Sequence, residues 1–338
     1  MRGALLAAGY WLLAPDRKAK RASPSLAAGA KVPKRTDQPA ASGQPPVAGL
    51  HTDRHPVCVP QGMARTSTFL LAGLAVLTMG FAQSDRPTEP VPVPKAASHP
   101  LRSLEHSAFK PGEKLSYVLH YGFVNAGVAT MELKEEAKDM NGRKILHARG
   151  EGHSVGAFKA FYKVDDLYES RFDRDGVFPW VFTRRCDEGG YIINQDYMYL
   201  QHRRQVTTQE HKTYDVPAHI QDMISAFYYA RTWDLRNVQV GQEFTVDVFI
   251  DNEVWPLKMK FVGRETIKVR SGKYRCLKFQ PMVQKGRIFK SNDDLNVWIT
   301  DDGNKIPVLA QAKILVGSIK MELTGYEGLA NPIAKVER

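Results

Sequence analysis

Residues 255–262 read WPLKMKFV, and this stretch decides the fold class because large apolar side chains occupy every second position. Trp255, Leu257, Met259 and Phe261 would share one face of an extended chain, while the residues between them would face the other way. Such period-two alternation with a single apolar face is typical of a half-buried antiparallel strand. The stretch therefore predicts a strand that packs one face against a core.

The same alternation recurs on both sides of this stretch, in residues 115–121, 295–299 and 319–323. Turn-forming clusters separate the runs, and Asn141-Gly142 and Asp251-Asn252 are pairs that favour two-residue hairpins. Helical patterns that could connect parallel strands are otherwise missing from this part of the sequence, which argues against a parallel sheet. We expect the strands to pair antiparallel.

One segment, residues 219–236, breaks the strand pattern and predicts a substantial helix. Its apolar residues recur at helical spacing downstream of a proline; they are Ile220, Met223, Ile224, Phe227 and Tyr228, with Pro217 before them. The predicted fold is mainly β, a curved antiparallel sheet or open β-barrel-like domain with this helix packed on it. Two separate β sandwiches, over about 110–212 and 241–328, are the alternative.

Residues 63–82 read MARTSTFLLAGLAVLTMGFA and have the organisation of a secretory signal peptide. A short basic start, an apolar stretch and a small-residue ending predict export, to the periplasm or outside the cell, with cleavage after Ala82. The apolar stretch is shorter than the roughly 20 residues that a membrane span needs. We therefore expect no transmembrane span in the mature chain.

The segments around this signal differ in composition. Residues 1–62 are rich in Ala, Pro, Lys and Arg, and predict disorder upstream of a true start at Met63. The alternative is a cytoplasmic extension with residues 69–82 left uncleaved as an anchor. Residues 83–106 predict a Pro-rich tether, residues 107–328 the exported β domain, and residues 329–338 a C-terminal tail.

The formal net charge of +11 over 338 residues is unevenly distributed along the chain. Residues 1–62 hold nine Lys or Arg against three Asp or Glu, whereas the chain after Ala82 holds 37 against 33. A nearly balanced folded domain indicates solubility rather than affinity for a polyanion. We expect no nucleic-acid partner.

The pentapeptide 152–156, GHSVG, matches the Gly-x-Ser-x-Gly motif of serine hydrolases. That motif works when a strained turn between a strand and a helix raises the serine hydroxyl above a parallel sheet. No alternating strand–helix pattern surrounds Ser154, so a Gly-rich strand end is the preferred interpretation. A hydrolase that uses Ser154 is kept as a third functional hypothesis, and no catalytic residue is assigned.

Metal and paired-carboxylate sites are not predicted either. Metal centres need three or four converging ligands, and no such set of histidine, cysteine or acidic residues clusters in the sequence. Adjacent aspartates such as Asp165 and Asp166 would face opposite sides of a strand, so both cannot face one substrate. No cofactor is predicted.

Two cysteines, Cys186 and Cys276, follow the expected cleavage site. In an oxidising compartment they could form a disulfide that closes a loop of about 90 residues. Two buried thiols in separate strands are the favoured alternative, because sequence gives no geometry.

Four patches are together similar to a known family; they are residues 109–117 (FKPGEKLSY), Gly122 with Ala126-Gly127, residues 222–231 (DMISAFYYAR), and residues 297–301 (VWITD) with Pro307-Val308. They resemble the bacterial exported family called domain of unknown function 3108. The resemblance implies an exported β-rich domain of the cell envelope and carries over no catalytic residue. In physical terms the patches favour architectural roles, with Asp222 and Ser225 able to cap the predicted helix.

The leading functional hypothesis is a non-enzymatic protein that binds or carries an apolar ligand, such as a lipid, between the curved sheet and the helix. The side chains expected to line that site are Tyr228, Trp255, Phe261 and Trp298. The second hypothesis is an envelope scaffold or assembly factor that binds a protein partner at an exposed sheet edge.

Overall fold

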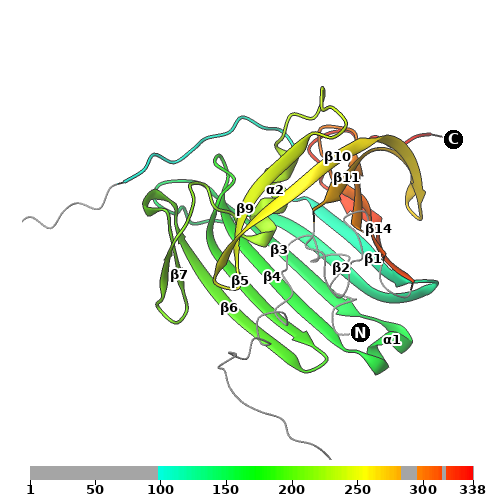
Figure 1. The fold of residues 1–338 in the computed structure, drawn as a ribbon, viewed down its shortest axis with the longest axis horizontal. Coiled ribbons are helices and arrows are strands. Elements are labelled where there is room, and N and C mark those ends of the chain that lie inside the picture. Colours follow the sequence, from blue (N-terminus) through cyan, green and yellow to red (C-terminus); the bar gives the residue numbers. More distant parts are fainter. Residues whose placement is uncertain (1–97, 283–294, 314–316, 338) are drawn as a thin grey trace, which may run out of the picture. The chain divides into compact units, whose positions relative to one another are not determined.

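Fourteen strands form one antiparallel sheet in the order β8-β7-β6-β5-β4-β3-β2-β1-β14-β13-β12-β11-β10-β9 (Figure 1). The computed structural model describes residues 98–282, 295–313 and 317–337. The expectations for residues 1–62, for the signal peptide 63–82 and for the first part of the tether lie outside the described residues. Because β8 and β9 are the two ends of the order, hydrogen bonds do not close the sheet into a barrel.

The first eight strands form one half of the sheet; they are β1 (Lys114–Tyr121), β2 (Val124–Glu135), β3 (Ile145–Ser154), β4 (Val164–Asp173), β5 (Pro179–Glu188), β6 (Tyr191–Leu200), β7 (Gln205–Thr208) and β8 (Thr213–Asp215). The remaining six form the other half; they are β9 (Glu243–Ile250), β10 (Glu253–Val269), β11 (Gly272–Pro281), β12 (Leu295–Thr300), β13 (Pro307–Lys313) and β14 (Ser318–Glu327). The helical elements are α1 (Gly156–Phe161), η2 (Gln201–Arg203) and α2 (Met223–Arg231). The prediction of a mainly β, antiparallel fold is confirmed.

Strand β1 joins the two halves, since it pairs with β2 on one side and β14 on the other. The alternative of two separate sandwiches is therefore wrong. Both predicted hairpins are confirmed: Asn141 (φ 51°) and Gly142 (φ 72°), like Asp251 (φ 54°) and Asn252 (φ 65°), have left-handed backbone conformations. Consecutive left-handed residues match the twist of the flanking strands in a two-residue turn.

The sheet curves so far that its last strands lie across the inner face of the first half. Figure 1 shows β9 and β10 crossing in front of β3–β6. The Gln195 side chain of β6 donates to Asp251 Oδ1 (3.0 Å) in the β9–β10 turn. The buried Tyr199 hydroxyl donates to the Phe249 carbonyl of β9 (3.3 Å). The inner face of the sheet is therefore covered by its own far end, and the core lies between them.

Helix α2 is nine residues long, Met223–Arg231, and so is shorter than the predicted helix over 219–236. Upstream, residue Gln221 is extended and forms a parallel bridge with Val248 of β9. Asp222 begins the helix as its N-cap, and its carboxylate accepts hydrogen bonds from the backbone N–H groups of Ile224 and Ser225. The prediction was too long at both ends, because Gln221 pairs with β9 before the helix begins and Thr232 ends the helix as its C-cap. The capping role of Asp222 and Ser225 is confirmed.

The domain also extends beyond both predicted boundaries. The backbone N–H of His99 donates to the His202 carbonyl (2.8 Å), so part of the expected tether is attached to the sheet. At the other end, Val336 donates to Lys273 (2.7 Å), and Arg275 donates to Ala334 (3.0 Å). The expected C-terminal tail therefore packs as an extra segment along β11, up to residue 337.

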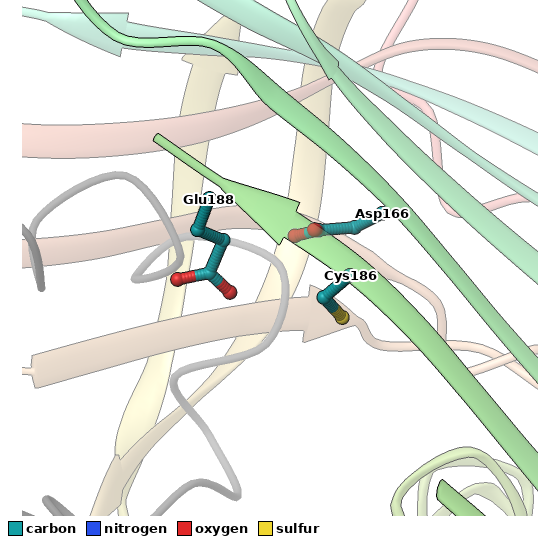
Figure 2. Close-up of side chains that lie close together, drawn as sticks. All are labelled: Asp166, Cys186 and Glu188. Atoms are coloured by element: carbon teal, nitrogen blue, oxygen red, sulfur yellow. The ribbon is translucent and has the colours of Figure 1, made fainter. Parts of the chain in front are cut away.

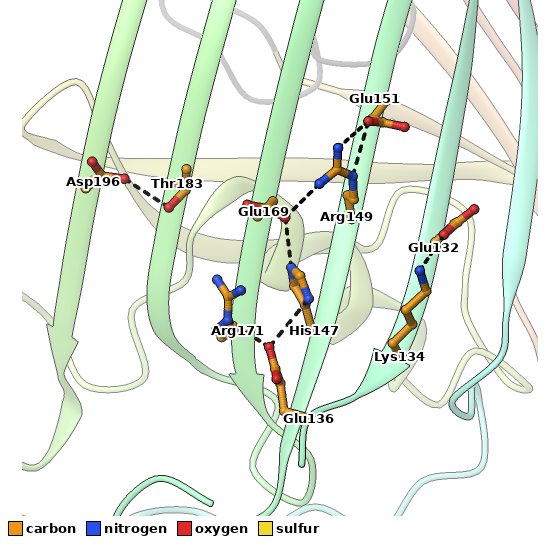
Figure 3. Close-up of polar contacts among 10 residues, drawn as sticks. All are labelled: Glu132, Lys134, Glu136, His147, Arg149, Glu151, Glu169, Arg171, Thr183 and Asp196. Atoms are coloured by element: carbon orange, nitrogen blue, oxygen red, sulfur yellow. Dashed lines mark hydrogen bonds and ion pairs between the residues drawn. The ribbon is translucent and has the colours of Figure 1, made fainter. Parts of the chain in front are cut away.

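The outer face of β2–β6 is covered by cross-strand ion pairs (Figure 3). His147 Nε2 lies 3.1 Å from Glu169 Oε1, and Arg149 Nη1 lies 3.2 Å from the same carboxylate oxygen. On the same face, Arg171 Nε donates to Glu136 Oε1 (2.8 Å). Because positive and negative groups alternate there, this surface is a solvated face rather than a basic patch.

Candidate ligand pocket

A buried arginine, Arg231 at the end of α2, connects two of the four sequence patches, its own and that of Glu113. Its guanidinium donates to both carboxylate oxygens of Glu113, at 2.6 and 2.7 Å. It also donates to the backbone carbonyls of Asn304 (2.8 Å) and Ala108 (3.1 Å). Arg231 and Glu113 are 2% and 1% exposed, so the ion pair is fully enclosed and fully hydrogen-bonded. We call Arg231 and Glu113 the arginine pair.

The start of α2 is equally well satisfied. The Asp222 carboxylate accepts from Ser225 N–H (2.7 Å) and, through its other oxygen, from the Ser170 hydroxyl of β4 (2.6 Å). Burial raises the pKa of Asp222 to about 6, and these hydrogen bonds oppose the shift. The helix is thus fixed at both ends by buried polar contacts, which position its apolar face over the sheet.

An apolar pocket of about 80 Å³ lies between this face of α2 and the inner side of β10–β12. The lining residues are mostly apolar; they are Ala226, Phe227, Ala230, Arg231, Trp233, Leu235, Leu257, Met259, Phe279, Val297, Ile299, Lys305 and Pro307. The pocket lies where the buried clusters of the two sheet halves meet, since Ala226 belongs to one cluster, Val297 to a second and Phe279 to a third. A hollow at such a junction can accept an apolar group without displacing any strand.

Two charged side chains, Arg231 and Lys305, are part of the pocket lining, and Lys305 is the one that is only half-buried. Its ammonium donates to the Arg231 carbonyl (3.1 Å) and lines the pocket beside Pro307. Burial, and then the nearby positive charge of Arg231, lower the pKa of Lys305. An anionic group at the pocket would relieve this disfavoured environment of the ammonium. The site can therefore accept a molecule with an apolar chain and an anionic end.

None of the four side chains that sequence reasoning proposed for the lining is among the pocket residues. Tyr228, Phe261 and Trp298 are 0%, 1% and 8% exposed and fill the packed clusters instead. Trp298 faces away from the pocket, and its indole N–H donates to Glu265 (2.5 Å). The alternation indicated the correct faces, because the pocket takes Leu257 and Met259 from β10 and Val297 and Ile299 from β12. The lining also includes the large side chains of Phe227, Trp233 and Phe279, so side-chain size did not identify which residues border the pocket.

A family profile described as "Protein of unknown function (DUF3108)" matches residues 116–324. The chain belongs to this family. The resemblance inferred from the four patches is thereby confirmed, and the structure gives the patches a physical meaning. In this DUF3108 chain, Glu113, Asp222, Arg231 and Asn304 hold the helix onto the sheet.

Solved structures to which this chain is similar share little sequence with it. A β-barrel-like protein of domain of unknown function DUF1849 from Brucella abortus is 10% identical, with a TM-score of 0.42; the match covers 65% of this chain and 99% of that chain. A DUF1089 family protein from Pseudomonas aeruginosa is 8% identical, with a TM-score of 0.30; the match covers 53% of this chain and 87% of that chain. No curated protein matches the DUF3108 chain.

The Gly-x-Ser-x-Gly motif lies at the end of β3, and its serine is engaged. Ser154 is 4% exposed, and its hydroxyl accepts a hydrogen bond from the Val164 backbone N–H (2.9 Å). His153 lies on the outer face instead, with Nδ1 3.0 Å from Asp165 Oδ1. A short helix, α1, does follow the motif, which sequence reasoning did not expect. The serine nevertheless ends a strand of an antiparallel sheet, so the geometry of a nucleophile turn is missing at Ser154.

Cys186 of β5 and Cys276 of β11 are both free and buried. They belong to different buried clusters, so the structure does not contain the disulfide considered from the sequence. Burial raises the pKa of each thiol to about 12. Among the described residues, no helix is long and apolar enough to span a membrane.

Proposed function

We propose that this DUF3108 protein binds or carries an amphiphilic ligand, such as a lipid with an anionic end, in the pocket under α2, without converting it chemically. The observation that carries the proposal is the composition of the pocket: apolar side chains from α2 and β10–β12 surround a hollow that also receives the half-buried ammonium of Lys305. The proposal adds export into the cell envelope, which is supported by the signal-like segment 63–82.

The size of the pocket leads to an expectation about chain length. Each buried methylene group contributes about 0.8 kcal/mol, which corresponds to about a fourfold gain in affinity. A pocket of about 80 Å³ is filled by a short length of chain, so the gain should stop once that length is reached. A pocket that encloses only a short length of the ligand chain suits a ligand that is bound and released rather than permanently bound.

A displacement titration with saturated fatty acids of increasing chain length tests the proposal. We expect affinity to rise with each methylene and then level off, and to fall at least tenfold in Ala230→Leu, because the added side chain fills the pocket. The matched control is Ala160→Leu on α1, an exposed position away from the pocket. Equal affinities in wild type and Ala230→Leu would exclude this pocket as the site.

The role of Lys305 can be tested separately by comparing a fatty acid with the alcohol of the same chain length. The wild-type protein should prefer the carboxylate, and Lys305→Gln should lose that preference while still binding the alcohol. If Lys305→Gln keeps the preference, the anionic end lies elsewhere.

A second candidate function, contact with a protein partner in the envelope, is favoured by exposed apolar side chains at one end of the sheet. Phe123, in the β1–β2 turn, is 105% exposed, and Phe161, at the end of α1, is 88% exposed. Ile192, beside the β5–β6 turn at the same end, is 57% exposed. Large contiguous apolar patches mark interaction surfaces, and these three exposed side chains share one end of the sheet.

The sheet edges favour such a partner less. Strand β8 has three residues, and β9 is already covered where Gln221 exchanges hydrogen bonds with Asp247 and Phe249. Photo-crosslinking in the envelope distinguishes the surfaces. A crosslinker at Phe161 should give a discrete protein adduct, while one at Met198, exposed on the outer face of β6, should not. Equal labelling at both positions would contradict a docking role for the end of the sheet that carries Phe123, Phe161 and Ile192.

A further inference from the structure

Three potential metal ligands converge on the inner faces of β4 and β5 (Figure 2), and none of them lines the apolar pocket. Asp166 and Cys186 are direct neighbours in the β4–β5 register, and Glu188 lies two residues beyond Cys186 on the same face. A carboxylate oxygen of Asp166, Sγ of Cys186 and a carboxylate oxygen of Glu188 all lie within 4.8 Å of one another. The three residues are 2%, 3% and 4% exposed. We call them the Asp–Cys–Glu site.

This site has unmet bonding capacity. Asp166 Oδ1 and Glu188 Oε1 are buried, and neither has a hydrogen-bond partner among the described residues. Leaving a buried polar atom without a partner costs about 1–3 kcal/mol, so such atoms in a folded protein usually bind something. On the β3 side, the residue opposite Asp166 is Gly152, which leaves the inner face there without a side chain. The two buried acceptors therefore remain without a partner among the described residues.

A cation that binds all three groups would take the place of the Cys186 thiol proton and of any carboxyl proton, and would release them to solvent.

We propose that Asp166, Cys186 and Glu188 bind a divalent transition-metal ion of the Zn²⁺ class. Carboxylate and thiolate together suit Zn²⁺, whereas Mg²⁺ and Ca²⁺ take oxygen ligands and would not use the thiolate. Three anionic ligands would carry a triple negative charge, of which a divalent ion neutralises two; the buried guanidinium of Arg184, which also pairs with Asp251 (3.4 Å), adds a positive charge nearby. Three protein ligands leave a fourth tetrahedral position for solvent.

Sequence reasoning assigned no metal because the ligands do not cluster along the chain. Only the β4–β5 register brings Asp166 next to the Cys186-Asp187-Glu188 segment, whose alternate members face inward. The inference does not depend on the proposed ligand pocket, since the two sites share no residue.

Titration of the full chain with Co²⁺, followed by competition with Zn²⁺, tests the proposal. The protein is first dialysed against a chelator, and bound metal is then measured by elemental analysis. We expect one ion per chain and a near-ultraviolet absorption band from thiolate–cobalt charge transfer, which Zn²⁺ abolishes. Affinity should rise with pH, since binding displaces protons.

Variants identify the ligands. Cys186→Ser should remove the charge-transfer band, and Asp166→Asn and Glu188→Gln should each weaken binding at least tenfold. The matched controls are Cys276→Ser, which removes the other buried thiol, and Asp165→Asn and Asp187→Asn, which change outward-facing neighbours. The controls should bind as the wild type does.

Two results would overturn the proposal: wild-type protein that binds no Co²⁺ with a thiolate band, or a band that survives in Cys186→Ser. Circular dichroism spectra check that each variant is folded. The amide variants should fold, because they keep the shape of each side chain and remove a buried charge. If Cys186→Ser alone does not fold, the band in Asp166→Asn and Glu188→Gln, measured against Asp165→Asn, decides the question.

Discussion

Two groups of buried charged side chains in the same domain differ in how completely they are satisfied. In the arginine pair, the Arg231 guanidinium has hydrogen-bond partners at Glu113, Asn304 and Ala108. In the Asp–Cys–Glu site, one oxygen each of Asp166 and Glu188 has no partner among the described residues. Both groups are almost fully enclosed, so burial alone does not separate a structural role from a binding role.

This comparison suggests a criterion: the number of hydrogen-bond partners of a buried charged group, rather than its burial, separates a structural role from a binding role. A fully bonded pair such as Arg231–Glu113 joins α2 to the start of β1 and gains nothing from a ligand. A site with orphaned acceptors is energetically incomplete, and a bound cation completes it. The predictions below change one of these two groups, or another polar contact that serves as a comparison.

The largest effect should follow from Glu113→Gln. This change leaves the buried Arg231 charge without its anionic partner, which typically costs about 3–5 kcal/mol. Urea unfolding measures the loss. The control is Glu132→Gln on the outer face, where Glu132 pairs with Lys114 and is more exposed, and the cost should stay below about 1 kcal/mol. Similar losses in both variants would contradict the structural role of the arginine pair.

Relieving the unsatisfied group should have the opposite sign. In metal-free protein, the pKa of Asp166 rises from 3.8 to about 6 and that of Glu188 from 4.5 to about 7, so between these limits the folded state binds more protons than the unfolded state. The associated stability is present below about pH 4 and is lost as pH rises through 6 to 7. A two-unit shift corresponds to about 3 kcal/mol for one carboxyl.

Asp166→Asn combined with Glu188→Gln should therefore be more stable than the wild type at pH 8, and its stability should change less between pH 4 and pH 8. Urea unfolding at both pH values gives the comparison, with Asp165→Asn as the control. If the free energy of unfolding changes by the same amount between pH 4 and pH 8 in the wild type and in the double variant, the raised pKa values are contradicted.

An intermediate effect is expected for Asp222→Ala. It removes the N-cap of α2 and leaves the Ser170 hydroxyl without its acceptor, for a combined cost of about 2 kcal/mol. Urea unfolding measures this, with Asp215→Ala in the exposed edge strand β8 as the control. If the two substitutions cost the same, the cap does not stabilise the helix.

The smallest effect should come from the outer face in Figure 3. Arg149→Gln breaks ion pairs with Glu151 and Glu169 that are partly exposed to solvent, so the loss should be below about 1 kcal/mol and should shrink at high salt. Urea unfolding at low and high salt provides the measurement. A loss as large as that of Glu113→Gln would show that burial does not separate these two groups of charges.

Local patterns predicted the strands and hairpins, because alternation and turn chemistry are properties of neighbouring residues. The helix was overestimated because apolar spacing does not mark where a helix begins or ends: Ile220 is buried outside α2, and Gln221 pairs with β9. The Arg231–Glu113 pair and the Asp–Cys–Glu site depend on which strands become neighbours, and alternation does not contain that information. The pocket lining was missed for the same reason, since it combines residues of α2, the segment after it and β10–β13, which alternation does not bring together.

Native mass spectrometry of the chain, expressed with its own N-terminal segment in a bacterial host, tests the central functional claim most directly. We predict the mass of a chain that begins at Gln83, and a second species in which this chain carries an amphiphile of defined mass. In Ala230→Leu the second species should be missing. An adduct that persists in Ala230→Leu, or a bare chain even after incubation with long-chain fatty acid, would contradict the account.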